Sequence, residues 1–425
     1  MQFYFNSGII QGNCDYRSFS IMNIKIAERM ADVHSDIRGP IFVEANRMSA
    51  QGIDVLKLNT GNPATFGFTM PDSVRNALLE NADKAVAYCD LKGMPAARNA
   101  ICSYHLGRGI QGVTPDDIFI GNGVSEVAQM VSTALFEIGD EILIPSPSYS
   151  LWTNLTVIAG AKPVLYICDE KSNWYPDLAD IRSKITSKTK ALLIINPNNP
   201  TGAVYPDEIL MGMIEIAREH NLLLLSDEIY DRLLMDGYTH SSTAALAPDM
   251  PVITFNGLSK SHIICGFRCG WLCVSGPESF KTAAVENIQK IAAMRLCGNA
   301  LTQLVIPAAL ADNESTQAMM VPGGRIYEQR EATCRALDQI PGISYVKNHA
   351  AFYLFPRIDA KRFNITSDKQ FAMDVLHGTN ILFIPGSGFD WAEPDHFRLV
   401  MLPEAPVIYD AMLRMGKFLE TYKQG

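Results

Sequence analysis

The sequence predicts an α/β fold: a large domain with a mostly parallel central sheet flanked by helices, plus a smaller α+β domain built from both chain ends. Through the middle of the chain, short continuous apolar runs alternate with helical patterns, and this texture changes after about residue 305. Apolar strands separated by helices are typical of a parallel sheet that is buried on both faces. A length of 425 residues also suits two lobes rather than one.

We expect four segments along the chain. They are an irregular N-terminal extension at 1–21, the first part of the small domain at 22–70, the large domain at 71–304, and the rest of the small domain at 305–425. The extension has neither the basic nor the apolar stretch of a signal peptide, and Met22 is an alternative start. In the first part of the small domain, a helix is expected near 41–50 and a strand at 55–59, which ends in a glycine turn.

In the large domain, each expected strand ends in a polar turn. Strands at 191–195, 222–225 and 252–255 run into turns that carry Asn199, Asp227 and Lys260. Ligands of open α/β sheets bind at the carboxyl ends of the strands. We therefore expect these three side chains to converge on one crevice.

A glycine turn at 121–123 lies between a short strand at 118–120 and a helix that begins near Val124 and Ser125. Free backbone N–H groups and the positive end of the helix dipole at such a place suit a phosphate. The alternative is an ordinary tight turn, because the third glycine of a dinucleotide-binding fingerprint is missing.

The C-terminal part is expected to form the smaller mixed sheet. A helix is predicted at 324–338, and strands at 351–355, 381–386 and 397–401. The region 22–65 is the expected partner of these strands, so the small domain would be discontinuous in sequence.

Composition argues against several classes of protein. The net charge of −9 comes from 36 basic and 45 acidic residues without long runs of one sign, so neither nucleic acid nor an acidic membrane is an expected partner. No apolar run approaches the length of a transmembrane helix.

Nine scattered cysteines without paired spacing favour a reduced cytoplasmic protein and no metal site. Cys265, Cys269 and Cys273 would form a metal-binding stripe if they shared a helix. The neighbouring glycines favour a loop followed by a strand, with small buried thiols.

Four motifs together carry a resemblance to a family. A Ser-Lys turn at Lys260 follows an apolar strand, with Gly-Phe-Arg-Cys-Gly at 266–270, Asn-Pro-Asn-Asn-Pro-Thr-Gly at 196–202 and Ser-Asp-Glu-Ile-Tyr at 226–230. From about residue 33 to 422 the chain resembles the class I, fold-type-I aminotransferases that depend on pyridoxal 5'-phosphate. Within that family it is similar to bacterial alanine (glutamate–pyruvate) aminotransferases.

The resemblance implies a role for each cofactor-site residue. Lys260 would form a Schiff base with the cofactor and then move a proton as the catalytic base. Asp227 would pair with the pyridine nitrogen, Asn199 and Tyr230 would bind the ring oxygen, and Tyr149 would stack on the ring. Taken singly, Asp227 is equally a helix cap, Asn199 a turn residue and Tyr149 a core aromatic.

The same resemblance assigns the phosphate and the substrate. Val124, Ser125, Ser259 and Arg268 would hold the phosphate, and Tyr88 would reach the phosphate of the neighbouring subunit in a homodimer. Gly257 is a departure, because many relatives have a hydroxyl residue there, and whether Ser259 replaces it is open. The substrate carboxylate would be bound by Arg398, Gly61 and Asn199. Arg38 and Arg295 are candidates for a second carboxylate.

The implied function is a ping-pong transfer of the amino group of a small amino acid, alanine in the first place, to 2-oxoglutarate, which gives pyruvate and glutamate. The alternative is a related aminotransferase that acts on aspartate, aromatic or branched substrates. A remoter one is a ligand-sensing module with the same fold, which would need a basic DNA-binding segment that this chain does not show.

Overall fold

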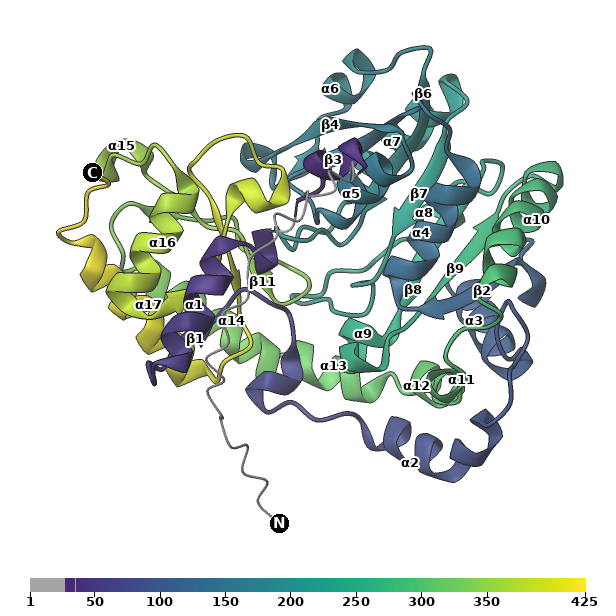
Figure 1. The fold of residues 1–425 in the computed structure, drawn as a ribbon, viewed down its shortest axis with the longest axis horizontal. Helices are drawn as coiled ribbons and strands as arrows, with labels where there is room; N and C mark the ends of the chain where they lie inside the picture. Colours follow the sequence, from purple (N-terminus) through teal and green to yellow (C-terminus); the bar gives the residue numbers. More distant parts are fainter. Residues whose placement is uncertain (1–26, 35) are drawn as a thin grey trace, which may run out of the picture.

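A computed structural model of the protein describes residues 27–34 and 36–425. The expected extension at 1–21 and the alternative start at Met22 lie outside these residues. The described chain forms two lobes side by side, and segments from both ends of the sequence build one of them (Figure 1).

An eight-stranded sheet forms the larger lobe. Its order is β2 (Ile118–Asn122), β9 (Cys269–Ser275), β8 (Val252–Gly257), β7 (Leu223–Asp227), β6 (Thr189–Ile195), β3 (Glu141–Ser146), β4 (Lys162–Asp169) and β5 (Tyr175–Pro176). The five strands from β8 to β4 are parallel, whereas β9 is antiparallel to both of its neighbours and β5 is antiparallel to β4. The mostly parallel sheet that the sequence predicts is therefore confirmed.

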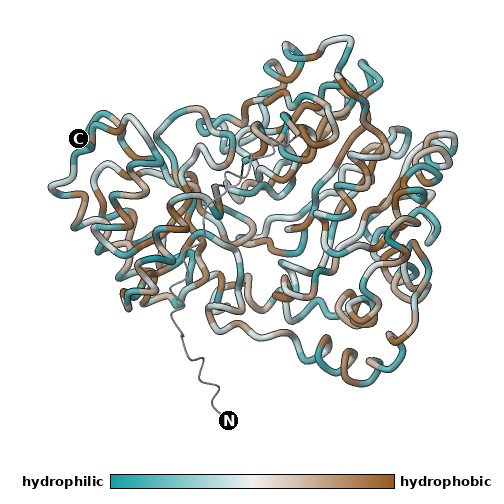
Figure 2. Tube along the Cα trace, viewed as in Figure 1, coloured by the Kyte–Doolittle hydropathy of each residue, from teal (hydrophilic) through white to brown (hydrophobic). Residues whose placement is uncertain are grey.

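Both faces of this sheet are buried, because alternate residues of each strand enter different hydrophobic clusters. In β6, Leu192 and Ile194 pack with α7, while Leu193 and Ile195 belong to the cluster of α4 and α10. The covering helices are α3 (Pro95–Gly107), α4 (Val124–Leu135), α5 (Leu151–Ile158), α6 (Leu178–Ser183), α7 (Asp207–Glu219), α8 (Thr243–Leu246) and α10 (Glu278–Met294). Hydrophobic segments gather in the interior of the lobe, as Figure 2 shows.

The smaller lobe joins the two ends of the chain. β1 (Leu56–Lys57) pairs in parallel with β13 (Ile381–Leu382), and β15 (Phe397–Val400) lies between β11 (Tyr353–Leu354) and β14 (Ile384–Pro385). A two-stranded ribbon is formed by β10 (Ile343–Ser344) and β12 (Arg357–Ile358). The helices α1 (Pro40–Ala50), α14 (Arg325–Leu337), α16 (Asp368–Thr379) and α17 (Ala405–Leu419) enclose one shared core.

Several elements connect the lobes or differ from the expectation. The expected strand at 55–59 pairs over two residues only, and the one at 381–386 is divided into β13 and β14. α12 (Ile306–Ala311) packs against α3 and α2 (Asp72–Asn81) of the larger lobe. The domain boundary at 304/305 stays a prediction.

The remaining short helices are α9 (Leu258–Ser261), α11 (Ala300–Gln303), α13 (Glu314–Met320) and α15 (Ala360–Phe363). The 3-10 turns are η1 (Glu28–Asp32), η2 (Asp36–Arg38), η3 (Pro63–Phe66), η4 (Ala82–Ala85), η5 (Pro115–Asp117), η6 (Glu170–Ser172), η7 (Cys265–Phe267) and η8 (Gly386–Phe389). Within the described ranges, no helix has both the length and the apolar character needed to cross a bilayer.

Candidate active site

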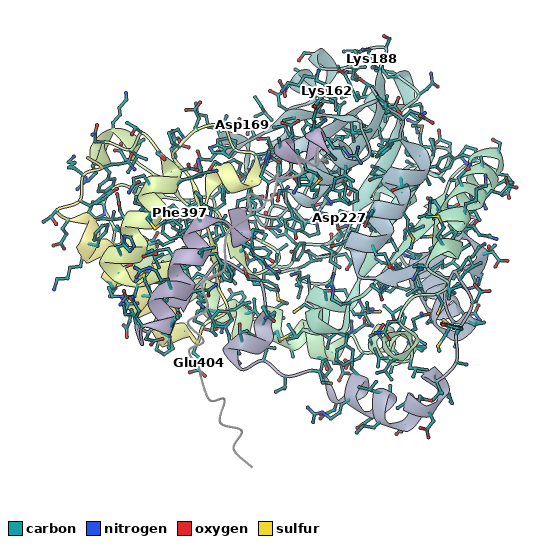
Figure 3. The ribbon with its side chains drawn as sticks, in the orientation of Figure 1. Lys162, Asp169, Lys188, Asp227, Phe397 and Glu404 are labelled. Carbon is teal, nitrogen blue, oxygen red and sulfur yellow. The ribbon has the colours of Figure 1, made fainter. Side chains whose placement is uncertain are left out.

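A cavity of about 570 Å³ lies where β6, β7 and β8 end, next to the smaller lobe. Figure 3 places Asp227 near the middle of the molecule, between the two lobes. The cavity brings together eleven of the twelve site residues that the sequence suggests: Gly61, Val124, Ser125, Tyr149, Asn199, Asp227, Tyr230, Ser259, Lys260, Arg268 and Arg398. Tyr88 is the exception.

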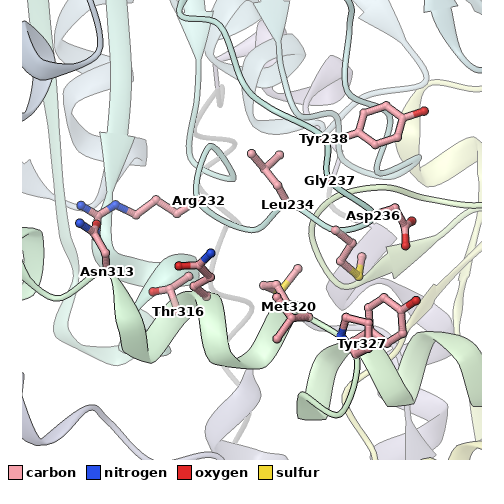
Figure 4. Close-up of a pocket in the computed structure, with 13 residues that line it drawn as sticks. Arg232, Leu234, Asp236, Gly237, Tyr238, Asn313, Thr316, Met320 and Tyr327 are labelled. Atoms are coloured by element: carbon pink, nitrogen blue, oxygen red, sulfur yellow. The ribbon is translucent and has the colours of Figure 1, made fainter.

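A second hollow, of about 680 Å³, opens beside α13 and is lined by Arg232, Asp236, Tyr238 and Tyr327 among others (Figure 4). It contains none of the suggested site residues. The candidate site is therefore the cavity at the strand ends.

Asp227 is the buried acid of the cavity. It is the last residue of β7, and its two carboxylate oxygens accept hydrogen bonds from the Trp152 indole nitrogen at 3.0 Å and from the Ile229 backbone N–H at 3.3 Å. Burial raises the pKa of Asp227 to about 6, although Trp152, Ile229 and the charge of Lys260 each lower it. A carboxylate in this place suits a cationic N–H partner.

Lys260 reaches the same space from α9, directly after β8. Its Nζ donates a hydrogen bond to the carbonyl oxygen of Gly61 at 3.1 Å and lies 5.9 Å from the centre of the Phe352 ring. The amine of this large-lobe residue thus contacts the smaller lobe, and no carboxylate in the described chain forms an ion pair with it within 4.0 Å.

The start of α4 forms an anion-binding cradle. Gly123 precedes the helix at φ +83°, and a Cβ built there would lie 2.4 Å from Nη2 of Arg268. The guanidinium of Arg268 therefore sits directly against the turn whose next residues, Val124 and Ser125, present N–H groups at a helix N-terminus. Positive charge and free backbone donors in one place fit a phosphate.

The structure explains the departure at Gly257. A Cβ at this position would come within 2.6 Å of the carbonyl oxygen of Cys269, because Gly257 pairs with Gly270 between two closely packed strands. A hydroxyl-bearing side chain has no room there. Ser259 lines the cavity, and its role as a replacement phosphate donor stays a prediction.

Arg398 comes from β15 of the smaller lobe and is almost fully buried. It donates to Asn199 Oδ1 at 3.2 Å and to the carbonyl oxygen of Asn59, while its Nε has no hydrogen-bond partner among the described residues. The rings of Tyr353 and Phe389 each lie 4.6 Å from its guanidinium carbon. A buried guanidinium with an unused donor is suited to a carboxylate ligand.

Tyr230 and Tyr149 line the cavity on the sides of β7 and α5. The hydroxyl of Tyr230 donates to that of Tyr353 at 3.1 Å, and burial raises the pKa of Tyr230 above its usual range. Tyr149 lies between β3 and α5, two residues before the helix begins, so its position follows from the turn after β3.

Tyr88 lies away from the cavity of its own chain. The residue is 82% exposed, in the loop before α3. Of the two arginines suggested for a second carboxylate, only one lines the cavity. Arg38 lines the cavity, whereas Arg295 does not and instead donates to the carbonyl oxygen of Ile120 at 2.8 Å.

The cysteine stripe does not lie on one helix. Cys265 is in the turn η7 and lines the cavity, whereas Cys269 and Cys273 are buried in β9. Burial raises the pKa of the Cys269 thiol to about 12. No cluster of potential metal ligands occurs among the residues that the structure describes.

Sequence reasoning missed three residues that support the cavity. Trp152 binds Asp227, Tyr353 contacts both Tyr230 and Arg398, and the Asn59 carbonyl accepts from Arg398. Trp152 and Tyr353 look like core aromatics in the sequence, and Asn59 looks like the last residue of the strand at 55–59. The sequence offers one clue, to the position of Trp152 and not to its role: it follows Tyr149 by three residues, so it is expected near the same cavity.

Comparison with known proteins gives one consistent result. Residues 53–408 match the family model described as aminotransferase class I and II. The chain is 47% identical to the glutamate-pyruvate aminotransferase AlaA of Escherichia coli K12, over 94% of this chain and 99% of that protein. It is also 47% identical to the alanine aminotransferase of Mycobacterium tuberculosis H37Rv, over 93% and 92% of the two chains.

A crystal structure of an aminotransferase from Escherichia coli superimposes with a TM-score of 0.93 at 47% identity, over 95% of this chain and 100% of that one. The cofactor of this family also fits the cavity, which offers a phosphate cradle at α4, an amine at Lys260 bound only to a backbone carbonyl among its described hydrogen-bond partners, and a buried carboxylate at Asp227. The chain therefore belongs to the class I and II aminotransferases and is a transaminase that depends on pyridoxal phosphate.

Proposed function

We propose that the protein transfers the amino group of L-alanine to 2-oxoglutarate, giving pyruvate and L-glutamate in a ping-pong cycle. The observation that carries this choice is the aliphatic part of the cavity lining that comes from residues 33 and 37 and from α5. These two parts of the chain contribute five aliphatic side chains: Val33, Ile37, Leu151, Leu155 and Ile158. They suit a small apolar side chain better than the carboxylate of aspartate.

The acceptor needs a second cation for its distal carboxylate. Arg38, in η2, is exposed and lines the same cavity, so it can meet that carboxylate at the mouth while Arg398 binds the inner one. The names of the two relatives, a glutamate-pyruvate and an alanine aminotransferase, agree with this pair of substrates.

When bound, pyridoxal phosphate supplies an electron-withdrawing ring that stabilises negative charge at the substrate α-carbon. In the proposed mechanism, Lys260 attaches the cofactor and then carries the proton to and from that carbon. Asp227 would hold a positive charge on the ring nitrogen, and Tyr149 would stack on the ring. Asn199 and Tyr230 would bind the ring oxygen, and Asn199 also positions Arg398 by accepting its hydrogen bond.

A coupled assay tests the proposal. Purified protein, loaded with pyridoxal phosphate, is given alanine and 2-oxoglutarate, and pyruvate is followed by its reduction with lactate dehydrogenase. We expect saturable pyruvate formation that depends on both substrates, with parallel double-reciprocal lines. Absence of pyruvate, while aspartate and 2-oxoglutarate still yield glutamate, would overturn the choice of alanine.

We further propose that the active form is a homodimer whose sites are completed by Tyr88 of the neighbouring subunit. Tyr88 is one of several large apolar side chains that are exposed on two segments of the larger lobe, together with Val86, Met294, Leu296 and Leu301. The loop before α3 is joined to the chain after α10, since Arg295 donates to Leu91 O at 3.4 Å and Gln303 of α11 accepts from the Met94 N–H at 2.7 Å. Large exposed apolar side chains on two connected segments favour a protein partner.

A cytoplasmic location is part of the same proposal. Eight cysteines in the described chain are free thiols, and five of them are buried in the core. Buried free thiols suit a reducing compartment.

A further inference from the structure

We propose that Trp152 is a positioning residue for the reaction, which uses its indole N–H to orient the Asp227 carboxylate toward the cofactor ring nitrogen. This inference rests on the proposed role of Asp227. It adds to that role a residue that does not line the cavity and whose indole reaches the cavity through a hydrogen bond to Asp227.

The geometry fixes the indole in place. Trp152 lies in the first turn of α5, and its ring meets that of Phe255 edge to face, with centroids 4.9 Å apart at 69°. Phe255 is the residue of β8 that pairs with Asp227 of β7. The aromatic contact and the carboxylate therefore belong to neighbouring strands of one sheet, and the indole has little freedom to turn away.

Each carboxylate oxygen of Asp227 accepts one hydrogen bond from the described residues. Oδ2 accepts the Trp152 N–H at 3.0 Å, and Oδ1 accepts the longer bond from Ile229 at 3.3 Å. A buried carboxylate with so few donors is held in one rotamer mainly by the shorter bond. Each donor also favours the charged form, and burial opposes it.

The start of α5 positions two aromatic residues, Tyr149 at the cavity and Trp152 behind Asp227. Tyr149 lines the cavity just before α5, and Trp152 follows three residues later, which is about one helical turn. The turn that brings an aromatic ring over the cofactor thus also brings the donor behind Asp227. An indole N–H does not titrate, so this support is the same at all physiological pH values.

The test replaces Trp152 by Phe, which keeps an aromatic ring and removes the N–H. The matched control is Trp391→Phe, because the Trp391 indole also donates to a carboxylate, that of Asp395, at 3.0 Å but outside the cavity. Both proteins are reconstituted with pyridoxal phosphate labelled with ¹⁵N in the ring. The ¹⁵N chemical shift reports protonation of the ring nitrogen without any turnover.

We expect Trp152→Phe to move the ¹⁵N shift toward that of neutral pyridine and to bind the cofactor about tenfold more weakly, the factor typical of one lost hydrogen bond to a charged group. Trp391→Phe is expected to keep the wild-type values. A Trp152→His variant, which retains an N–H donor, should restore part of the shift.

An unchanged ¹⁵N shift and unchanged affinity in folded Trp152→Phe would overturn the proposal and leave Trp152 as a core residue. If that variant does not fold, β-benzothienylalanine at position 152 keeps the indole shape without the N–H, and the same two outcomes decide. A shift already neutral in the wild-type protein would instead refute the role of Asp227. None of these measurements depends on alanine as the substrate.

Discussion

Lys260 donates a hydrogen bond to the carbonyl oxygen of Gly61 at 3.1 Å, across 199 residues of sequence. Lys260 follows a strand of the large sheet, and Gly61 follows the strand that opens the smaller lobe. The contact therefore places the reactive amine at the boundary between the lobes, with a neutral acceptor that a substrate can displace.

The first prediction concerns this amine. Lys260→Ala should lower kcat by a factor on the order of 10⁴ or more, because both the covalent attachment of the cofactor and the proton transfer are lost. Borohydride reduction followed by mass spectrometry should link the cofactor to the wild-type chain at Lys260 and leave this variant unlabelled. Turnover near the wild-type rate in the variant would refute the assignment.

Asp227→Asn should bind substrate normally and lose about 10² or more in kcat, because a neutral amide does not hold a proton on the ring nitrogen. Steady-state kinetics with alanine measure both constants. Asp231→Asn is a poor control, since Asp231 is buried and accepts from Asn256 at 2.9 Å; the exposed Asp116→Asn is the better one. An unchanged kcat would make Asp227 structural.

Arg398→Lys keeps the charge and removes the planar fork. We expect kcat/KM for alanine to fall about ten- to a hundredfold, since hydrogen bonds to charged groups contribute about 1.5–3 kcal/mol. Arg357→Lys, in the neighbouring ribbon and half exposed, is the matched control. Equal effects of the two substitutions would contradict the carboxylate role of Arg398.

These residues show which features of the fold and the site can be predicted from the sequence. The strand ends, the helix at the phosphate turn and the buried parallel sheet were all predictable, because apolar runs and polar turns have strong local patterns. The role of Trp152 was not, since its partner Asp227 lies 75 residues away and only packing brings them together. The steric reason for Gly257 likewise depends on the neighbouring strand β9.

A fourth prediction follows from an ion network between the lobes. His396 lies 2.7 Å from Asp395 and 3.6 Å from Glu170 of the larger lobe, and Arg357 contacts both carboxylates. These carboxylates raise the pKa of His396 above 6.5 despite its burial. Its contribution to stability is thus fully present below pH 6.5 and is lost as the pH rises through the folded-state pKa.

His396→Gln should therefore lower the free energy of unfolding more at about pH 6 than at about pH 9, as measured by urea denaturation. His377→Gln serves as control, because His377 is half exposed and meets Glu44 within the smaller lobe. A loss of stability that is the same at both pH values would show that the charge of His396 is not involved.

The fifth prediction tests the shared site. Tyr88→Phe and Lys260→Ala are each expected to be impaired, and mixing them with subunit exchange should restore up to about half of the wild-type activity per dimer, because one site then has an intact Lys260 and the partner's tyrosine. Exchange is confirmed by native mass spectrometry. If the mixture gains nothing after exchange, Tyr88 serves its own subunit.

The central claim is that residues of this cavity catalyse the transfer of the amino group of alanine to the cofactor. Stopped-flow absorbance of the cofactor-loaded protein, mixed in single turnovers with alanine, aspartate, phenylalanine or valine, measures it directly. The account predicts that alanine converts the cofactor fastest, with no conversion in Lys260→Ala. Faster conversion by aspartate or phenylalanine than by alanine would contradict it.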